Sequence, residues 1–290
     1  MADKKLAERV GIFLLNKGFT IKSLTRCCFH MIARKGSRIL LVKVLADANA
    51  ISDEYAEQMK NLSNYIEASP FIVAERAGSE LEENVVYSRH GVHTLSFHTF
   101  RNSIENKLPY IISSKAGLTA NISGERLKSV IEESGFSLSD LSKKIGVSRR
   151  MISNYEKGSQ ITIQKAEKLY DMFGHSVFEK IDIFAQQGMP LPAGRETTIT
   201  RKYSELGFEA SETRKVPFNV IARKEEDIIL TEVGNKINPH TTSLSRLLDA
   251  DNLVIFSRNR PKEKDVPALT TQEFMEFEES NELIKFLREF

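Results

Sequence analysis

Ser153 and Asn154 follow Arg150 by three and four positions, so the three polar side chains lie on one face of a helix. An arginine guanidinium makes two hydrogen bonds to guanine in the major groove of DNA, and an asparagine amide makes two to adenine. A short exposed helix with such residues at its front is what reading base edges requires. The side chains that we expect to contact DNA are Ser137, Lys144, Ser148, Arg149, Arg150, Ser153, Asn154 and Lys157.

Two short helices and a tight turn are expected to position these side chains. Ser137 is a good N-cap for the first helix, on which Leu141 and Ile145 share one apolar face. Gly146 permits the turn, because glycine reaches positive φ without steric cost. Ser148 caps the second helix, whose apolar residues repeat toward the core. The polar residues of the second helix are therefore left facing outward.

The stretch from about residue 123 to 184 resembles the Cro/C1-type helix-turn-helix family. Helical spacing on both sides of the motif adds a first and a fourth helix, and a capping box of Ser176 and Glu179 predicts a fifth. The resemblance implies an all-α DNA-binding domain. Leu138 departs from it at a position where a phosphate-contacting glutamine is common, and Ser142 replaces the usual alanine. An ordinary helical hairpin also carries surface arginines, and the Gly-Val-Ser turn in register with its flanking helices favours DNA binding over it.

Positive charge is concentrated on the proposed DNA face. Between Lys143 and Gly158, five basic residues against one acidic residue give +4, whereas the whole chain of 290 residues has a formal net charge of +2. Attraction to phosphate supplies most of the non-specific affinity for DNA. A nearly neutral chain must therefore rely on this local patch.

The remaining composition narrows the class of protein. The length suggests about two or three domains, and 41% of hydrophobic residues is enough for packed cores. The apolar runs are too short to span a bilayer, and the charged N-terminus is not that of a signal peptide. The adjacent Cys27 and Cys28 favour a reducing cytoplasm over a disulfide. His90, His93 and His98 fit no strong metal-binding spacing and are expected to be surface or partly buried histidines, so we expect no metal site. We also expect no cofactor.

An internal repeat flanks the helix-turn-helix segment. Gly18 stands eleven positions before the run FHMIARK at 29–35, and Gly207 stands equally far before the run FNVIARK at 218–224. The apolar run that follows stays in register between the copies, and the similarity resumes later with shorter connections in the second copy. Similarity held in register over this length predicts a duplicated domain.

Each copy has the pattern helix, strand, turn, strand, helix, strand and a last helix. In the first copy, strands at 28–33 and 39–45 are joined by a short polar turn, which makes them an antiparallel hairpin. The next strand, at 71–74, is reached through a helix over 53–66, which suits a parallel neighbour. The expected fold class is mixed α/β, with a central all-α helix-turn-helix domain between two similar mixed-sheet α/β domains.

This order of elements resembles the restriction-endonuclease-like nucleases, especially the archaeal Holliday-junction resolvases. The resemblance implies an aspartate at the start of the hairpin and Glu-x-Lys on its second strand, where the acids hold Mg²⁺ and the lysine assists the attacking water. The residues at these positions are His30, Lys43 and Leu45 in the first copy, and Asn219, Glu232 and Gly234 in the second. Neither copy keeps the set, so both modules are expected to be non-catalytic and the chain is expected not to be an enzyme. Unrelated mixed α/β domains are the alternative interpretation.

Three domains are expected from these patterns: a nuclease-like α/β domain at 1–115, a Cro/C1-type helix-turn-helix domain at 116–185, and a second nuclease-like α/β domain at 195–290. The first join begins at 113–117, and two prolines and two glycines make 186–194 the clearer linker. Over nearly its whole length the chain resembles a family of archaeal HTH-type transcriptional regulators, whose function is inferred chiefly from the same motif.

These features predict a cytoplasmic, sequence-specific transcriptional regulator that binds double-stranded DNA as a homodimer. A dimer would place two half-sites about 34 Å apart along the duplex. The two α/β modules could supply the dimer surfaces or could pair with each other within one chain, and the sequence leaves both possibilities open. The alternatives are a nuclease or resolvase targeted by the helix-turn-helix, and an architectural or toxin–antitoxin-like factor whose flanks bind another protein. The sequence identifies no small-molecule effector.

Overall fold

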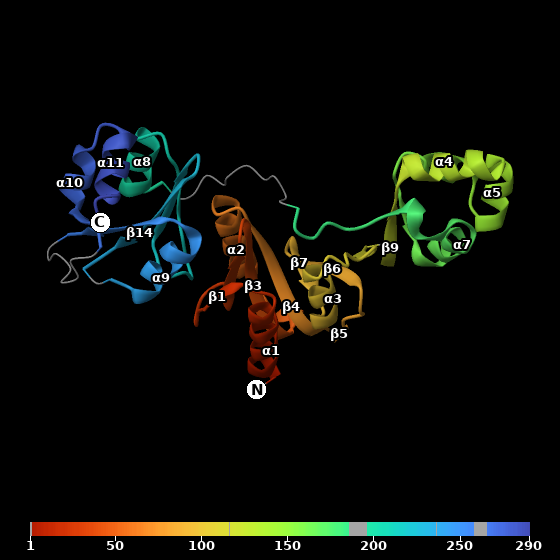
Figure 1. The fold of residues 1–290 in the computed structure, drawn as a ribbon, viewed down its shortest axis with the longest axis horizontal. Coiled ribbons are helices and arrows are strands. Elements are labelled where there is room, and N and C mark those ends of the chain that lie inside the picture. Colours follow the sequence, from red (N-terminus) through yellow and green to blue (C-terminus); the bar gives the residue numbers. More distant parts are fainter. Residues whose placement is uncertain (1, 116, 186–195, 236, 258–265) are drawn as a thin grey trace. The chain divides into compact units, whose positions relative to one another are not determined.

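The structure, a computed structural model, describes residues 2–115, 117–185, 196–235, 237–257 and 266–290 (Figure 1). The chain forms two compact units, one made of Met1–Ile72 with Ala185–Phe290 and the other of Val73–Phe184. Both flanking α/β modules contribute to the first unit, and the division into three domains stays a prediction. The predicted linker at 186–194 lies outside the described residues.

The N-terminal module of the first unit is a mixed sheet covered by a helix. Its elements are α1 (Ala2–Asn16), β1 (Thr20–Ser23), β2 (Met31–Lys35), β3 (Arg38–Asp47), the 3-10 helix η1 (Ala48–Ala50), α2 (Asp53–Tyr65) and β4 (Ala68–Ala77). The strands follow the order β1-β2-β3-β4, and β1, β2 and β3 are antiparallel neighbours. Helix α1 packs on β3, where its Val10 and Leu14 are fully buried.

The C-terminal module repeats this plan. Its elements are α8 (Thr198–Glu205), β12 (Glu209–Glu212), β13 (Val220–Lys224), β14 (Asp227–Val233), α9 (Pro239–Leu248), β15 (Asp251–Phe256), β16 (Ala268–Thr270), α10 (Thr271–Glu276) and α11 (Ser280–Leu287). The strands follow the order β12-β13-β14-β15-β16. Strand β15, reached through α9, is parallel to β14, as its helical connection predicts.

The hairpin registers of the two modules are identical. Strand β1 pairs with β2 so that Thr20 faces Arg34, and β12 pairs with β13 so that Glu209 faces Arg223. The next pair repeats the match, with Met31 opposite Val42 in one module and Val220 opposite Thr231 in the other. Equal registers through three strands agree with the predicted duplication, because the hydrophobic pattern of each strand sets its register.

The two modules contact each other within the chain through a reciprocal pair of arginines. Arg34, from the hairpin of the first module, donates from Nη1 to the carbonyl of Leu247 at 2.9 Å, and its Nη2 lies 2.6 Å from the Asp249 carboxylate. Arg223, its counterpart in the second module, donates from Nη1 to the carbonyl of Tyr65 at 3.1 Å and is ion-paired with Glu67. Both acceptor pairs stand at the end of a helix, α9 or α2. Each module therefore supplies the donor that satisfies the other module's helix terminus.

The second unit joins the far half of β4 to the helix-turn-helix segment. Its further elements are β5 (Ser79–Glu80), β6 (Val85–Arg89), β7 (Val92–Leu95), α3 (Phe97–Ile104), β8 (Ile111–Ser114), β9 (Gly117–Ile122), α4 (Gly124–Ser134), α5 (Leu138–Ile145), α6 (Arg149–Tyr155), β10 (Gln160–Thr162), α7 (Ile163–Phe173), the 3-10 helix η2 (Gly174–Val177) and β11 (Phe178–Glu179). The strand order is β4-β7-β6-β8-β9-β10, with β11 also paired to β9. The sheet thus runs on into the segment that carries the helices.

Two details of the helix-turn-helix domain differ from the prediction. The fifth helix is absent from the described residues at Ser176–Glu179, because Phe178 pairs with Ile122 and Glu179 pairs with Asn121 as strand β11. The domain is not purely helical either, since β9, β10 and β11 form a small sheet beside α7. The expected join at 113–117 coincides with the β8–β9 hairpin, where Ser114 pairs with Gly117.

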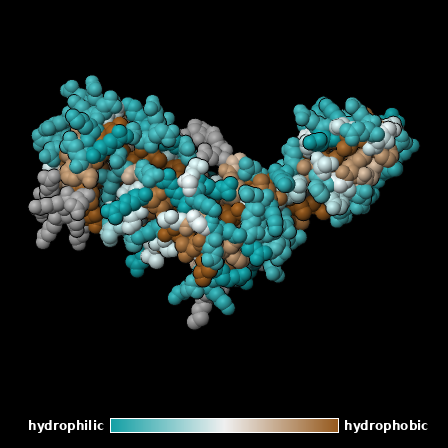
Figure 2. All heavy atoms as spheres, viewed as in Figure 1, coloured by the Kyte–Doolittle hydropathy of each residue, from teal (hydrophilic) through white to brown (hydrophobic). Residues whose placement is uncertain are grey.

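Polar side chains cover most of the face of the molecule that Figure 2 presents. This is expected when the long apolar residues fill the cores. None of the helices within the described ranges combines the length and apolar character needed to cross a membrane.

The reciprocal arginines give a testable expectation for stability. Changing Arg34 or Arg223 to alanine should lower the free energy of unfolding by about 1–2 kcal/mol, because a helix-terminal carbonyl and a carboxylate each lose a charged donor. Urea denaturation followed by circular dichroism measures the change. Arg34→Lys should recover only part of the loss, because lysine lacks the two-pronged donor geometry.

Arg246→Ala serves as the matched control, because Arg246 is an exposed arginine on α9. It should change stability by no more than about 0.5 kcal/mol. An Arg34→Ala variant as stable as the Arg246→Ala control would show that the arginine does not hold the two modules together.

Candidate nucleic-acid interface

Helix α5 begins at a serine cap, as its sequence predicts. The Ser137 hydroxyl accepts from the backbone N–H of Asp140 at 3.1 Å and donates to the Asp140 carboxylate at 2.5 Å. The Ser137 hydroxyl is the main cause that lowers the pKa of Asp140 below its ordinary value, and Lys143 and Lys144 add a smaller effect. Leu141 and Ile145 are fully buried on the face of α5 that packs into the core. The cap and the apolar face together fix the start and the rotation of α5.

Gly146 ends α5 and makes the turn into α6. Its φ is +77°, in the left-handed region that glycine adopts without strain. The backbone N–H groups of Gly146 and Val147 both donate to the Ser142 carbonyl, at 2.9 and 3.0 Å. The Lys165 ammonium on α7 donates to the Gly146 carbonyl at 3.1 Å. The turn is therefore held both by its own backbone and by a neighbouring helix.

Helix α6 presents its polar face because its apolar residues are buried. Ser148 caps it by accepting from the Met151 N–H at 3.2 Å. Ile152 and Tyr155 are 0% and 3% exposed, and burial raises the pKa of Tyr155 above its ordinary value. The side chains left on the outer face of α6 and its end are Arg149, Arg150, Ser153, Asn154 and Lys157, of which Ser153 alone is half-buried.

The eight expected DNA contacts all lie on this motif, but several of them also have intramolecular partners. Ser137 and Ser148 cap the two helices, so their hydroxyls accept from backbone N–H groups. Arg149 donates from Nη2 to the Ser139 hydroxyl at 2.8 Å, which links α6 to α5. The Lys144 ammonium stands 4.2 Å from the centre of the Phe136 ring. These contacts hold the side chains in position while leaving Arg149 and Lys144 exposed.

Arg150 is the exposed arginine at the front of α6 to which no hydrogen bond or ion pair is assigned among the residues that the structure describes. The Asn154 amide lies beside Met151, with 3.9 Å between Nδ2 and the sulfur, which is a weak interaction. Both side chains therefore have donors to offer to another molecule. These are also the residue types that recognise guanine and adenine.

Three residues that shape this motif carry no signal in the sequence by which they could have been predicted. Ser139 and Phe136 position Arg149 and Lys144, and neither residue type signals such a role. Gly124, the first residue of α4, lies so close to α6 that an added Cβ would be 2.3 Å from the Glu156 carbonyl oxygen. This contact joins segments 32 residues apart in the sequence. Spacing along the chain could not have revealed it.

The positions expected for nuclease aspartates have the same backbone role in both modules. His30 accepts at Nδ1 from the N–H of Val44 at 3.1 Å, and Asn219 accepts at Oδ1 from the N–H of Val233 at 2.8 Å. The backbone N–H of His30 donates to the carbonyl of Val42 on β3, and the backbone N–H of Asn219 donates to the carbonyl of Thr231 on β14. The two modules therefore correspond also at the position where the nuclease motif would have its aspartate.

The second acid position is a buried lysine in one module and a buried glutamate in the other. The Lys43 ammonium donates to the Cys27 carbonyl at 3.1 Å and lies 4.7 Å from the centre of the Tyr55 ring. Glu232 accepts at Oε2 from the Asn238 N–H at 2.7 Å, while its Oε1 is buried without a hydrogen-bond partner in the described part of the chain. Burial raises the pKa of Glu232.

These side chains do not form the donor set that a nuclease magnesium ion requires. Magnesium is bound by carboxylates and water in near-octahedral geometry. Lys43 places a cation at one acid position of the first module. In the second module Asn219 stands at the other compared position, and its amide oxygen already accepts from the backbone N–H of Val233. Across the described ranges, no cluster of three or more His, Cys, Asp or Glu residues could hold a metal ion.

Comparison with known families divides the chain into two recognisable parts. Residues 3–109 match the model of the PD-(D/E)XK superfamily domain, and residues 127–176 match the helix-turn-helix model. The second match runs from within α4 to beyond α7 and contains all eight expected DNA contacts. No solved structure matches the chain significantly. The fold and these matches define a helix-turn-helix protein with an N-terminal nuclease-superfamily domain.

Similar proteins are known from several archaea. A protein of Pyrococcus abyssi is 30% identical, covering 99% of this chain and 95% of its own length, and one of Thermococcus gammatolerans is 29% identical over 99% and 96%. A third, from Methanospirillum hungatei, is 32% identical over 81% and 80%. All three bear the description "Putative HTH-type transcriptional regulatory protein". The chain belongs to this family of archaeal HTH-type regulatory proteins.

The expectation that the chain is not an enzyme is contradicted by the first family match. The PD-(D/E)XK superfamily is a nuclease superfamily, so the match over residues 3–109 points to a possible nuclease. The nuclease motif comprises three positions in each module, whereas the match extends over residues 3–109, from α1 to beyond α3. Substitution at those positions is therefore too narrow a basis for excluding catalysis.

Proposed function

We propose that this protein is a sequence-specific DNA-binding transcriptional regulator that reads the major groove with α6. The observation that carries the proposal is the exposed Arg150 and Asn154 on a helix whose opposite face is locked by buried Ile152 and Tyr155. A recognition helix must be rigid, because base contacts depend on the fixed direction of a few side chains. The N-cap at Ser148 and the turn at Gly146 supply that rigidity.

The remaining residues of the interface suit contacts to phosphate. Lys144 and Lys157 are exposed near the ends of α5 and α6, where they can approach the DNA backbone. The Ser137 and Ser148 caps stand at helix N-termini, which attract anions. Such contacts set the orientation on DNA without specifying sequence. We expect this activity in the cytoplasm, which the free, buried Cys27 and Cys28 suit.

Base reading and phosphate binding are separable by two substitutions. Arg150→Ala should weaken binding to the specific duplex by roughly 1–3 kcal/mol and affect a scrambled duplex much less, because a bidentate base contact is lost. Lys144→Ala should weaken both duplexes to a similar extent and reduce the salt dependence of binding, because a phosphate contact is lost. Fluorescence anisotropy titrations on a duplex selected from genomic fragments measure both effects.

Lys128→Ala is the matched control, because Lys128 is an exposed lysine on α4 outside the motif. Its affinity for both duplexes should remain close to that of the unchanged protein. Equal losses on specific and scrambled DNA for Arg150→Ala would remove this arginine from the base-reading set.

We further propose that the protein acts as a homodimer. One short recognition helix reads only a few base pairs, and a symmetric pair doubles the site. The faces joined by Arg34 and Arg223 are already used within each chain, so a second copy would have to bind elsewhere. We therefore expect the dimer surface to lie outside those faces.

Light scattering of the purified protein should give a mass of about 66 kDa, twice the chain mass of 32.9 kDa. A footprint on the selected duplex should then show two half-sites with about 34 Å between their centres. A monomer with a single asymmetric footprint would refute the homodimer.

A metal-dependent DNA nuclease is the second candidate function, and the PD-(D/E)XK match favours it. The helix-turn-helix would then deliver the nuclease domain to its DNA. Glu232 is the one carboxylate at the compared positions, although it lies in the second module and outside the matched range. A catalytic role for Glu232 would require its carboxylate to be ionised, and burial opposes ionisation by raising its pKa.

Cleavage assays with linear, branched and four-way-junction DNA in magnesium or manganese test this candidate. If Glu232 carries the activity, Glu232→Gln should abolish nicking while leaving DNA affinity intact. Activity that survives Glu232→Gln would place the nuclease site in the matched N-terminal module, and the complete absence of nicking on all three substrates would refute the nuclease candidate. Glu226→Gln is the control, because Glu226 is an exposed acid at the β13–β14 turn.

A further inference from the structure

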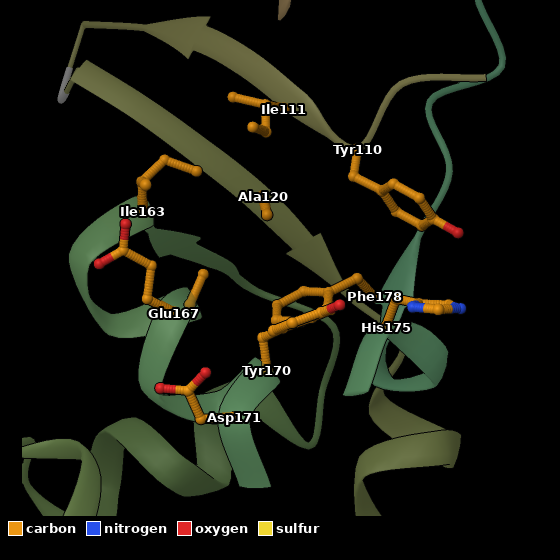
Figure 3. Close-up of a pocket in the computed structure, with 10 residues that line it drawn as sticks. Tyr110, Ile111, Ala120, Ile163, Glu167, Tyr170, Asp171, His175 and Phe178 are labelled. Carbon is orange, nitrogen blue, oxygen red and sulfur yellow. The ribbon is translucent and has the colours of Figure 1, made fainter. Parts of the chain in front are cut away.

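An apolar cavity of about 500 Å³ lies in the second unit, between the β8–β9 hairpin and α7 (Figure 3). Ile111, the first residue of β8, and Tyr110 just before it line one side, and Ile163 and Tyr170 from α7 line the other. Phe178 of β11 closes the end near Tyr170 and His175. Small-molecule sites in proteins enclose roughly 300–1,000 Å³ and are mostly apolar with a few polar groups, so this cavity has the size and lining of such a site.

The charged groups at the cavity are all of one sign. Glu167 and Asp171 are four positions apart on α7, and both line the cavity with exposed carboxylates. No lysine or arginine is among the residues assigned to its lining. A bound anion would therefore meet repulsion from two carboxylates, whereas a bound cation would be attracted by both.

The aromatic rings of the cavity also favour a cationic ligand. Tyr170 is 51% exposed and stacks with His175, with 6.1 Å between ring centres and 24° between ring planes. Tyr110 lies across the opening from Tyr170 in Figure 3. Flat apolar groups stack on such rings, and ammonium groups are attracted to ring faces. Carboxylates and aromatic rings thus favour the same ligand chemistry.

We propose that this cavity is a ligand site for a small organic cation, a molecule with a flat apolar body and an ammonium group. The body would lie against Tyr110, Ile111 and Ala166, and the ammonium group would face Glu167 and Asp171. The apolar lining provides affinity by burying hydrocarbon surface, and the two carboxylates select the charge.

The same helix connects this site to the helix-turn-helix turn. Ala166 lines the cavity and belongs to the core of the DNA-binding domain, together with Leu169. One position before Ala166, Lys165 donates to the Gly146 carbonyl in the turn between α5 and α6. A ligand that orders α7 therefore also orders the contact that holds the turn. On the proposed DNA-binding function, ligand and DNA should alter each other's affinity.

Tryptamine is a suitable probe, because it has an indole body and an ammonium group, and the protein contains no tryptophan. Its indole fluorescence can be followed at the red edge of the tyrosine absorption without a protein signal. We expect a saturable change in fluorescence with the full chain in the absence of DNA. Indole-3-acetate, which is anionic, and 3-methylindole, which is neutral, should each bind at least roughly tenfold more weakly.

The double variant Glu167→Gln, Asp171→Asn should weaken tryptamine binding by roughly tenfold while leaving 3-methylindole unaffected. Tyr170→Ala should weaken both ligands, because it removes a ring that both contact. Glu132→Gln is the matched control, since Glu132 is an exposed acid on α4 away from the cavity. Circular dichroism of each variant verifies that it is folded before its binding is compared.

Tryptamine binding that is absent, or that is unchanged in the double variant and in Tyr170→Ala, would overturn the proposed site. A dimer that Tyr170→Ala converts to a monomer would also overturn it, because the cavity would then be a contact between copies. The coupling is tested separately, by measuring DNA affinity with and without saturating tryptamine. If tryptamine binds while DNA affinity stays constant, the proposed connection through Lys165 is wrong. If the protein binds no DNA at all, the regulator function is refuted, and the measurement of ligand binding still stands.

Discussion

The exchange of arginines between the two α/β modules is the interaction on which the first unit depends. Arg34 and Arg223 occupy the same place in two copies of one hairpin, and each reaches the terminus of the other module's helix. The last carbonyls of a helix have no partners within it, so an external donor there satisfies groups that would otherwise need water. The arrangement has the self-complementary form of an isologous dimer, formed here within one chain.

The contacts of the two arginines explain why the run Ile-Ala-Arg-Lys is found in both modules. The arginine of Ile-Ala-Arg-Lys also donates from Nε to a turn carbonyl, to Gly36 in the first module and Glu225 in the second. A guanidinium is the side chain able to serve a turn, a helix terminus and a carboxylate at once, because its donors form a rigid fork. The lysine that follows lies close to the ring of Phe19 in the first module and of Phe208 in the second. Conserving the run between copies thus conserves one set of contacts.

The parts of this fold that the sequence predicted are those with local causes. Ser137, Gly146 and Ser148 are recognised by the caps and the turn that their own side chains or backbone make. Strands β1 and β12 were missed, because Thr20–Ser23 and Glu209–Glu212 are short and largely polar and form only by pairing with the hairpin. The predicted fifth helix was wrong for the same reason, since pairing with β9 outweighed the local capping signal at Ser176.

Long-range contacts account for the rest of what the sequence did not predict. Whether the modules pair within or between chains depended on Arg34 meeting Asp249, more than 200 positions away. The cavity beside α7 likewise needs Tyr110 and Tyr170 to come together. Helix α7 then connects three roles by its periodicity: Leu169 is buried in the core, Lys165 reaches the turn at Gly146, and Tyr170 faces the cavity. Because these three residues belong to one helix, a displacement of α7 at the cavity would also move the backbone that carries Lys165.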